Sequence, residues 1–471
     1  PSSSSSSDSN INIQDSIMSG DVNIEQNARD ASSAINLVDS AMSGDINITQ
    51  NNLDDIRQAL SQELERLGFV GQSSPAELTP SQEKEVEQVL EMSTQLADHG
   101  VDINPWTEIG LGNAAKRIGK FGNAQKFYLG ALETFRIYSD REGEAASLGS
   151  LGNVAQKLEN FDEAERLQRA SLDISREIND RIGEYKGLTN LGSILMDSGN
   201  IEGAEKFFLR SLAIGREIGQ DTKIGSPLIG LANIAKLREE FNEAERLYKE
   251  SLVASREIGD FETEAESLFG LGSTSESLGK FVESEGLYFG ALEICRATGY
   301  KILEPTLLFS LGRLAQYQDN FVEAERLYHE SLTLFREIGD RKQEVLNLFA
   351  IGRISERQGH IAEAIRSYHE TLEINKEIGF IDGEQLSLYA LGKIAKEQED
   401  FTKAERLYHE ALALTRKIGD REKEADRLID LAEVARLRND PSEQRRLISE
   451  AVGIWREIGI PINQWYIDNG Y

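Results

Sequence analysis

A stretch of twelve residues returns every 40 residues along most of this chain. The sequence FNEAERLYKESL begins at Phe241, FVEAERLYHESL begins at Phe321, and FTKAERLYHEAL begins at Phe401. The register holds from about Asn104 to Ile460. A fixed period of this size indicates an array of one supersecondary unit, which is usually a surface that holds other chains. The period therefore limits both the fold and the class of function.

Each unit carries the pattern of two antiparallel helices. In one half, apolar or small residues recur at steps of three and four, as in Phe241, Ala244 and Tyr248, which is the buried stripe of a helix. A glycine follows most of these helices, in a position to take the left-handed conformation past the helix end. The other half carries a Leu-Gly pair, as at Gly272. Because glycine inside a helix costs about 1 kcal/mol against alanine, its recurrence predicts close approach of the partner helix.

These columns resemble the tetratricopeptide repeat. The signature of the first helix (helix A) is met by Leu268, Leu271-Gly272 and Ser275, and that of the second helix (helix B) by Ala244, Tyr248 and Ser251-Leu252. The period departs from the usual unit of about 34 residues. Arginine also replaces the proline that often ends the family's unit, at Arg176, Arg216, Arg256, Arg336 and Arg416. The resemblance implies an all-α fold, a right-handed superhelical α-solenoid of nine helix pairs in which helix A lines a concave groove.

The chain is expected to have four parts. Residues 1–53 form a Ser/Asn-rich, non-helical segment, 54–103 two capping helices, 104–460 the nine repeats, and 461–471 an aromatic tail. The first part contains a duplicated motif, at residues 15–27 and 39–51, in which a Ser-Gly-Asp turn signal precedes an alternating run. Two readings stay open: a disordered tail, or short strands that must pair with something, because isolated short strands are unstable in water.

Composition narrows the function. The net charge is -30, with 81 acidic and 51 basic residues, so duplex nucleic acid and anionic membranes are poor partners. Cys295 is the single cysteine, which excludes an internal disulfide. No apolar run reaches the roughly 18 residues of a membrane span. The chain begins at Pro1, so we expect it to be extracellular if Pro1 is a processed mature end and cytoplasmic otherwise.

The sequence offers no catalytic set, no cofactor motif and no metal site. His329, His369 and His409 form one column on helix B. Equivalent positions of adjacent repeats lie two helix widths apart, on the order of 20 Å, so these histidines cannot share one ion. Solvated helix positions are therefore the expected role of this column, and we expect a protein that is not an enzyme.

Groove candidates come from the free side of helix A. An aromatic column could form a ladder for an extended peptide, or could complete the packing between adjacent helices; it comprises Phe269, Phe309, Phe349 and Tyr389. Four residues further on lies a polar column that begins with amides and continues with basic residues: Asn113, Asn153, Asn233, Arg313, Arg353 and Lys393. The resemblance implies that the amides bind the backbone of an extended ligand. The basic strip suggests an acidic peptide segment, or is a solvated face.

The leading hypothesis for the partner is a second copy of this chain, bound head to tail. A solenoid has two unlike ends, and a contact between them propagates into a ring or filament. The candidate self-assembly residues lie in the two terminal segments: Ile13, Val22, Ile24, Ile46, Ile48, Trp465, Tyr466, Ile467 and Tyr471. The alternative is a monomeric adaptor or regulatory arm that binds an extended peptide of another protein in its groove.

Overall fold

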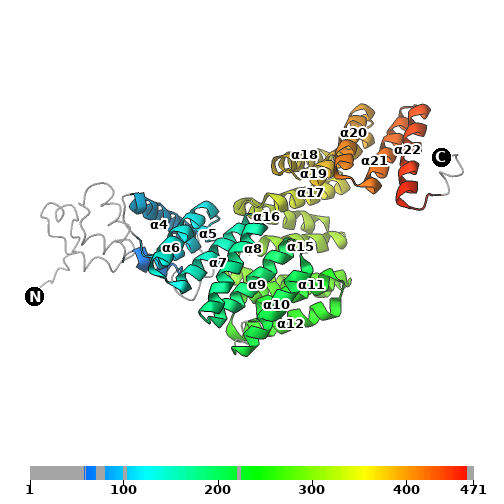
Figure 1. The fold of residues 1–471 in the computed structure, drawn as a ribbon. Coiled ribbons are helices and arrows are strands. Elements are labelled where there is room, and N and C mark those ends of the chain that lie inside the picture. The colour runs from blue at the N-terminus through cyan, green and yellow to red at the C-terminus, as the bar shows by residue number, and fades with distance from the viewer. Residues whose placement is uncertain (1–57, 59, 70–79, 99–102, 220–223, 464–471) are drawn as a thin grey trace, which may run out of the picture. The chain divides into compact units, whose positions relative to one another are not determined.

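The computed structural model of the chain (Figure 1) describes residues 58, 60–69, 80–98, 103–219 and 224–463. These residues form helices and contain no strand. The chain divides into two compact units, Pro1–Lys301 and Ile302–Tyr471. The segments that sequence analysis assigned to strands, 15–27 and 39–51, lie outside the described residues, and so does most of the C-terminal tail.

Helix bounds follow the repeat register closely. The described residues of the first unit contain a helical segment at 60–66, then α4 and five helix pairs: α4 (Pro80–Asp98), α5 (Pro105–Arg117), α6 (Phe121–Tyr138), α7 (Arg141–Lys157), α8 (Phe161–Glu177), α9 (Arg181–Asp197), α10 (Ile201–Glu217), α11 (Gly225–Leu237), α12 (Phe241–Ile258), α13 (Phe261–Ser277) and α14 (Phe281–Thr298). The second unit contains four pairs in its described residues: α15 (Glu304–Tyr317), α16 (Phe321–Ile338), α17 (Arg341–Gln358), α18 (Ile361–Ile378), α19 (Ile381–Glu397), α20 (Phe401–Ile418), α21 (Arg421–Leu437) and α22 (Pro441–Ile458).

The helices stack in chain order, as expected of a solenoid. Within each unit a helix packs chiefly against the helices before and after it in the sequence. The first helices of neighbouring repeats also touch, as α11 touches α9 and α13. The predicted all-α array of helix pairs is thereby confirmed. Local signals place the helix ends: at one such joint Gly339 adopts φ 78° after α16, and the Asp340 carboxylate accepts a hydrogen bond from the Gln343 backbone N–H at 3.1 Å.

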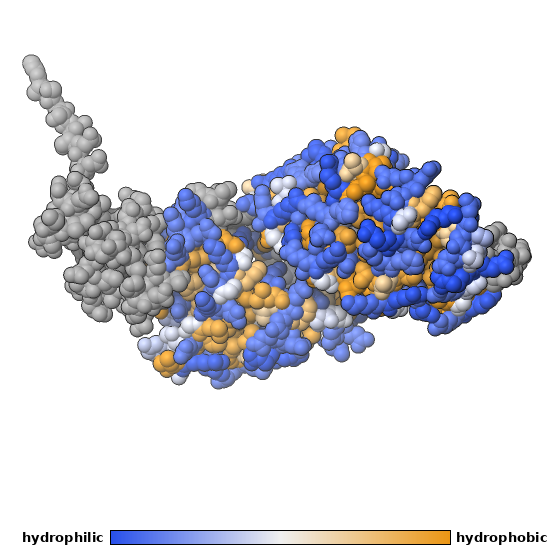
Figure 2. Space-filling view, turned by 90° about the horizontal axis from the view of Figure 1, so that it is seen from above, coloured by the Kyte–Doolittle hydropathy of each residue, from blue (hydrophilic) through white to orange (hydrophobic). Residues whose placement is uncertain are grey.

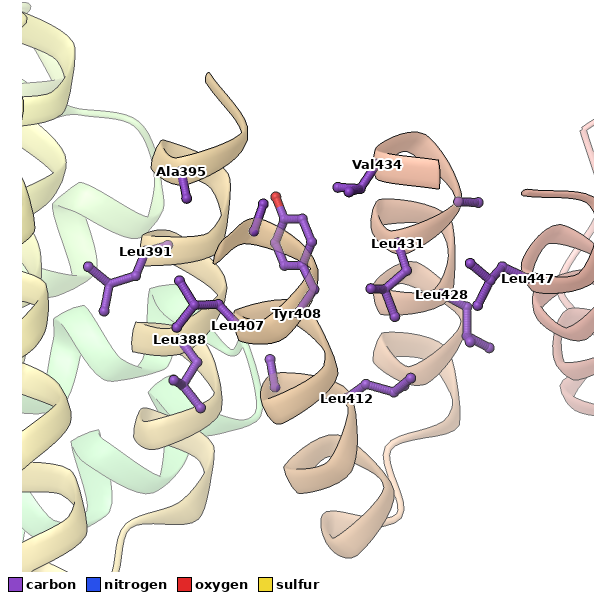
Figure 3. Packing of buried hydrophobic residues seen from close by; sticks show 14 of the residues in the cluster. Leu388, Leu391, Ala395, Leu407, Tyr408, Leu412, Leu428, Leu431, Val434 and Leu447 are labelled. Atoms are coloured by element: carbon purple, nitrogen blue, oxygen red, sulfur yellow. The ribbon is translucent and has the colours of Figure 1, made fainter. Parts of the chain in front are cut away.

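The core of most repeats is a helix B ring packed on a helix A glycine. The helix B tyrosines are almost fully buried, with at most 1 % of their surface exposed: Tyr128, Tyr248, Tyr288, Tyr328, Tyr368 and Tyr408. A Cβ atom added to Gly392 on α19 would lie 2.7 Å from Cε1 of Tyr408 on α20. In Figure 3 the Tyr408 ring lies among Leu407, Leu431 and other buried side chains of the second unit. The recurring Leu-Gly pair is thus explained, because the close contact is between the helix A backbone and the tyrosine ring.

The extra length of the repeat forms an ionic joint. At the joint between the second and third repeats, Glu184 on α9 is buried, with 5 % of its surface exposed. It accepts a hydrogen bond from Nε of Arg176 at 3.0 Å and from Nη1 of Arg181 at 2.5 Å. Arg181 also pairs with Glu217 at the end of α10. Equivalent glutamates pair with two arginines in three other repeats, at Glu144, Glu344 and Glu424. Arginine at the usual proline position therefore fastens one repeat to the next.

We predict that Gly392→Ala destabilises the second unit. Its new methyl group would lie within 2.8 Å of two Tyr408 ring atoms, and overpacking costs about 1–3 kcal/mol. Gly453→Ala on α22 is the matched control, because no atom lies within 4 Å of its Cβ position; it should be neutral or stabilise by up to about 1 kcal/mol. Urea unfolding followed by circular dichroism measures both. Equal shifts for the two variants would contradict the packing argument.

We predict that Glu184→Gln reduces the loss of folding stability that the chain shows as pH falls into the acid range. Burial raises the pKa of Glu184, but Arg176 and Arg181 outweigh burial and hold it below its ordinary value. The carboxylate therefore stabilises the folded state above about pH 4.5, and this contribution is lost as pH falls through the lowered pKa. The variant should lose about 1–3 kcal/mol at pH 7, and its difference from the parent should shrink below about pH 4.5. Glu133→Gln, at an exposed position of α6, serves as the control; a constant difference at every pH refutes this account.

Candidate functional site

The predicted amides lie on the first helices of the first unit. Asn113 on α5, Asn153 on α7 and Asn233 on α11 are all half-buried. The amide oxygen of Asn113 accepts a hydrogen bond from the Tyr128 hydroxyl at 2.7 Å, and that of Asn233 accepts one from Tyr248. A side-chain amide that uses its oxygen in this way keeps two N–H donors. The buried tyrosine thereby fixes which end of the amide can donate to a ligand.

Asn153 differs from the other two amides. Its repeat has Gln168 where others have the buried tyrosine, and its side chain makes no hydrogen bond to the described residues. Only two of the three predicted amides are therefore held by the core. The sequence already showed this difference, because Gln168 occupies the position of the buried tyrosine.

The aromatic column lies against other members of the buried tyrosine column. Each ring is half-buried and packs on the tyrosine of its own repeat. The centroid distances are 5.6 Å for Phe269–Tyr288, 5.2 Å for Phe309–Tyr328, 5.2 Å for Phe349–Tyr368 and 5.9 Å for Tyr389–Tyr408. These spacings are typical of aromatic pairs that stabilise a core. The half-exposed edges leave the peptide-ladder hypothesis open as a prediction.

The basic strip of the second unit is partly neutralised. Nζ of Lys393 on α19 pairs with Glu356 on α17 at 2.5 Å, and this hydrogen bond raises the pKa of Lys393. Arg313 on α15 is half-buried. Arg353 on α17 is exposed and makes no ion pair with the described residues. Positive charge on this strip is therefore most accessible at Arg353.

One cluster in the second unit was missed by sequence analysis. The guanidinium of Arg427 on α21 lies 3.6 Å from the centroid of the Tyr389 ring. Nη1 of Arg427 also pairs with Asp430 at 3.0 Å. Burial raises the pKa of Asp430 to about 6, although Arg427 opposes this shift. The sequence did contain a sign of this cluster. The positions equivalent to Arg427 and Asp430 in the earlier repeats hold small or neutral residues, so the two charges are unusual at these positions.

The first unit curves so that first helices of distant repeats face each other. Nη2 of Arg117, at the end of α5, lies 3.9 Å from Oε1 of Glu262, near the start of α13. Close by, the Tyr300 hydroxyl donates to Glu266 of α13 at 2.9 Å, and burial raises the pKa of Glu266. Burial together with the neighbouring Arg117 lowers the pKa of Lys116. The helix A positions of this unit therefore line an inner surface with charged groups of both signs.

Two clefts lie beside the helix B faces. One, of about 450 Å³, has an apolar floor that includes Leu148, Leu151 and Val154 of α7. The other, of about 560 Å³, lies between Arg341 and the acidic end of α18. In the view of Figure 2, hydrophobic residues lie in patches between hydrophilic helix faces. Within the described residues, no helix combines the length and apolar character that a membrane crossing needs.

The self-assembly candidates are not placed by the structure. The terminal residues on which that prediction depends all lie outside the described residues: Ile13, Val22, Ile24, Ile46, Ile48, Trp465, Tyr466, Ile467 and Tyr471. Head-to-tail contact therefore stays a prediction from sequence.

Comparison with solved structures finds similar helical arrays. A STAND protein (Signal Transduction ATPase with Numerous Domains) with a tetratricopeptide repeat sensor, from Pyrococcus horikoshii, aligns with a TM-score of 0.56 at 12% identity, over 90% of this chain and 71% of that chain. A Rap protein complexed with Competence and Sporulation Factor aligns with a TM-score of 0.49 at 14% identity, over 77% of this chain and 98% of that chain. The apo quorum sensor NprR from B. thuringiensis has a TM-score of 0.49 and 13% identity, over 85% and 99% of the two chains. At these identities the likeness to the first structure concerns the fold alone.

Sequence comparison gives the family. No curated protein matches this chain significantly. The tetratricopeptide repeat model matches residues 105–177, 186–257, 303–377 and 384–457, which together make up more than half of the chain. The chain therefore belongs to the tetratricopeptide repeat family, a family of protein-interaction scaffolds.

Proposed function

We propose that this protein is a non-catalytic scaffold whose helix A face binds an extended polypeptide. The observation that carries the proposal is the pair of hydrogen bonds from buried tyrosines to groove amides, Tyr128 to Asn113 and Tyr248 to Asn233. Each bond ties a ligand-facing donor to the core of its repeat. A donor that is already fixed loses little conformational entropy when it binds a ligand.

The chemistry of the amides suits a peptide backbone. Extended chains present carbonyl oxygens at regular intervals, and a column of N–H donors on a solenoid offers matching partners. Such contacts read the backbone rather than a particular side chain, so they support affinity for an extended segment of many sequences. Specificity would then come from side-chain contacts elsewhere on the helix A face.

Those side-chain contacts differ between the two units. Arg353 provides an exposed cation for an acidic guest side chain in the second unit, whereas Lys393 is already paired with Glu356. In the first unit, Glu262 lies 3.9 Å from Arg117, and Lys157 acts on Glu266. We therefore expect a guest segment with an acidic residue opposite Arg353 and mixed charge elsewhere.

We predict that Asn233→Asp weakens peptide binding about tenfold, equal to about 1.4 kcal/mol. Aspartate keeps an oxygen that accepts the Tyr248 hydrogen bond but has no N–H donors, so the fold should be retained. Binders selected from a library of unstructured peptides against the full chain are the probes, and fluorescence anisotropy measures their affinity. Asn242→Asp, at an exposed position of α12, changes the charge equally and should leave affinity unchanged. Equal losses for both variants, or a library without binders, would refute the proposed groove.

Head-to-tail self-assembly is the second candidate function. The duplicated motif at 15–27 and 39–51 and the aromatic residues of 461–471 favour it, because they offer apolar strand-like and aromatic surface at opposite ends of the chain. The charge of -30 per subunit opposes close stacking, and salt screens that repulsion.

We predict that assembly, if it uses these ends, grows stronger with salt and is abolished by deleting residues 1–53. Sedimentation velocity of the full and shortened chains at about 0.1 and 1 M salt measures this directly. A chain that stays monomeric at high concentration and high salt, or a deletion without effect, rejects self-assembly. Neither result bears on peptide binding in the groove.

A further inference from the structure

Three potential metal ligands meet between two neighbouring helices of the second unit. Glu325 and His329 lie four residues apart on α16, and Glu363 is the third residue of α18. One ligand atom from each side chain lies within 4.8 Å of the other two. Residues four apart on a helix share one face, so α16 presents its imidazole and carboxylate toward the same point as Glu363.

The chemistry of this set favours a transition metal. Imidazole nitrogen and carboxylate oxygen both bind zinc at about 2.0–2.2 Å. Calcium and magnesium prefer oxygen ligands alone, so the histidine selects against them. Glu325 and Glu363 are half-buried and His329 is exposed, so small side-chain rotations can bring the three atoms onto one ion while water completes the coordination.

A nearby amide adds an independent observation. In two other repeats an arginine pairs with the glutamate 33 residues before it: Arg238 with Glu205 at 2.7 Å, and Arg438 with Glu405. The residue 33 positions after Glu325 is Gln358. Its Oε1 atom is buried and has no hydrogen-bond partner in the described part of the chain. An amide with an unpaired carbonyl oxygen therefore occupies the register position from which arginine reaches the equivalent glutamate in those two repeats.

The other histidines of the column provide internal comparisons. Glu405, His409 and Glu443 repeat the same spacing, but Arg438 pairs with Glu405 and Arg446 pairs with Glu443 at 2.6 Å. Around His369 the equivalent positions are Ile365 and Lys403.

Among the described residues, Glu325 and Glu363 make no ion pair with an arginine, Arg366 included. His329 is therefore the one histidine of the column that has two carboxylates beside it without arginine partners. The sequence-based argument that the column histidines cannot share an ion still holds, because the partners of His329 are carboxylates.

We propose that Glu325, His329 and Glu363 bind one divalent transition-metal ion of the zinc type, which joins α16 to α18. The ion would connect the second helices of adjacent repeats on the side opposite helix A. It would add a cross-link between two repeats that otherwise meet through packing and ion pairs, the buried Glu344 joint among them. The proposal is independent of peptide binding in the groove.

The test uses the full chain after treatment with a chelator and dialysis. Zinc chloride titrated by calorimetry in buffer with millimolar magnesium should bind at one site, and cobalt chloride should give the visible absorption of a coordinated ion. His329→Ala should weaken zinc binding at least tenfold and abolish the cobalt spectrum. His369→Ala and His409→Ala should bind as the parent does. Circular dichroism of each variant verifies folding.

Two further variants make the test sharper. Gln358→Arg should pair with Glu325, as arginine does in the equivalent positions, and should weaken zinc binding at least tenfold without unfolding the chain. The double variant Arg438→Gln with Arg446→Gln should free the carboxylates beside His409 and raise the stoichiometry from one ion to two. Zinc binding that is equally weak in all variants, or that survives in both His329→Ala and Gln358→Arg, would overturn the proposal.

Discussion

In most repeats the core depends on the contact between a glycine of helix A and a buried aromatic ring of helix B. At Gly392 the ring of Tyr408 occupies the space that a side chain would need. Helix propensity is sacrificed at this position, at a cost of about 1 kcal/mol. The cost is offset by burial of a whole aromatic ring, which brings about 1.5–3 kcal/mol by the hydrophobic effect.

The same ring has a second role at its hydroxyl end. The hydroxyls of Tyr128 and Tyr248 reach Asn113 and Asn233 on the free side of helix A. A residue that fills the core therefore also orients a side chain at the surface. This connection gives a physical reason to look for the ligand along helix A: buried polar groups need partners, and here the partner is a surface amide.

A second constraint acts between repeats rather than within them. The buried carboxylate at Glu184 is held by Arg176 from the preceding helix and by Arg181 from its own helix. Isolated surface ion pairs contribute little, but a buried carboxylate with two arginine partners is costly to leave unpaired. Both arginines of this joint lie within the six residues beyond the usual unit, so the longer period has a structural use.

The sequence alone determined the fold class, the helix pairs and their ends. Those features depend on local interactions that recur in register, such as the cap at Asp340 and the glycine at Gly339, so a column of residues reveals each of them. Only the tertiary structure decided which side chains meet across helices. The group of Glu325, His329 and Glu363 depends on how two adjacent repeats pack, and the ion pair of Arg117 with Glu262 depends on small rotations that accumulate over several repeats. No local pattern encodes that sum, whereas the folded chain brings those residues together.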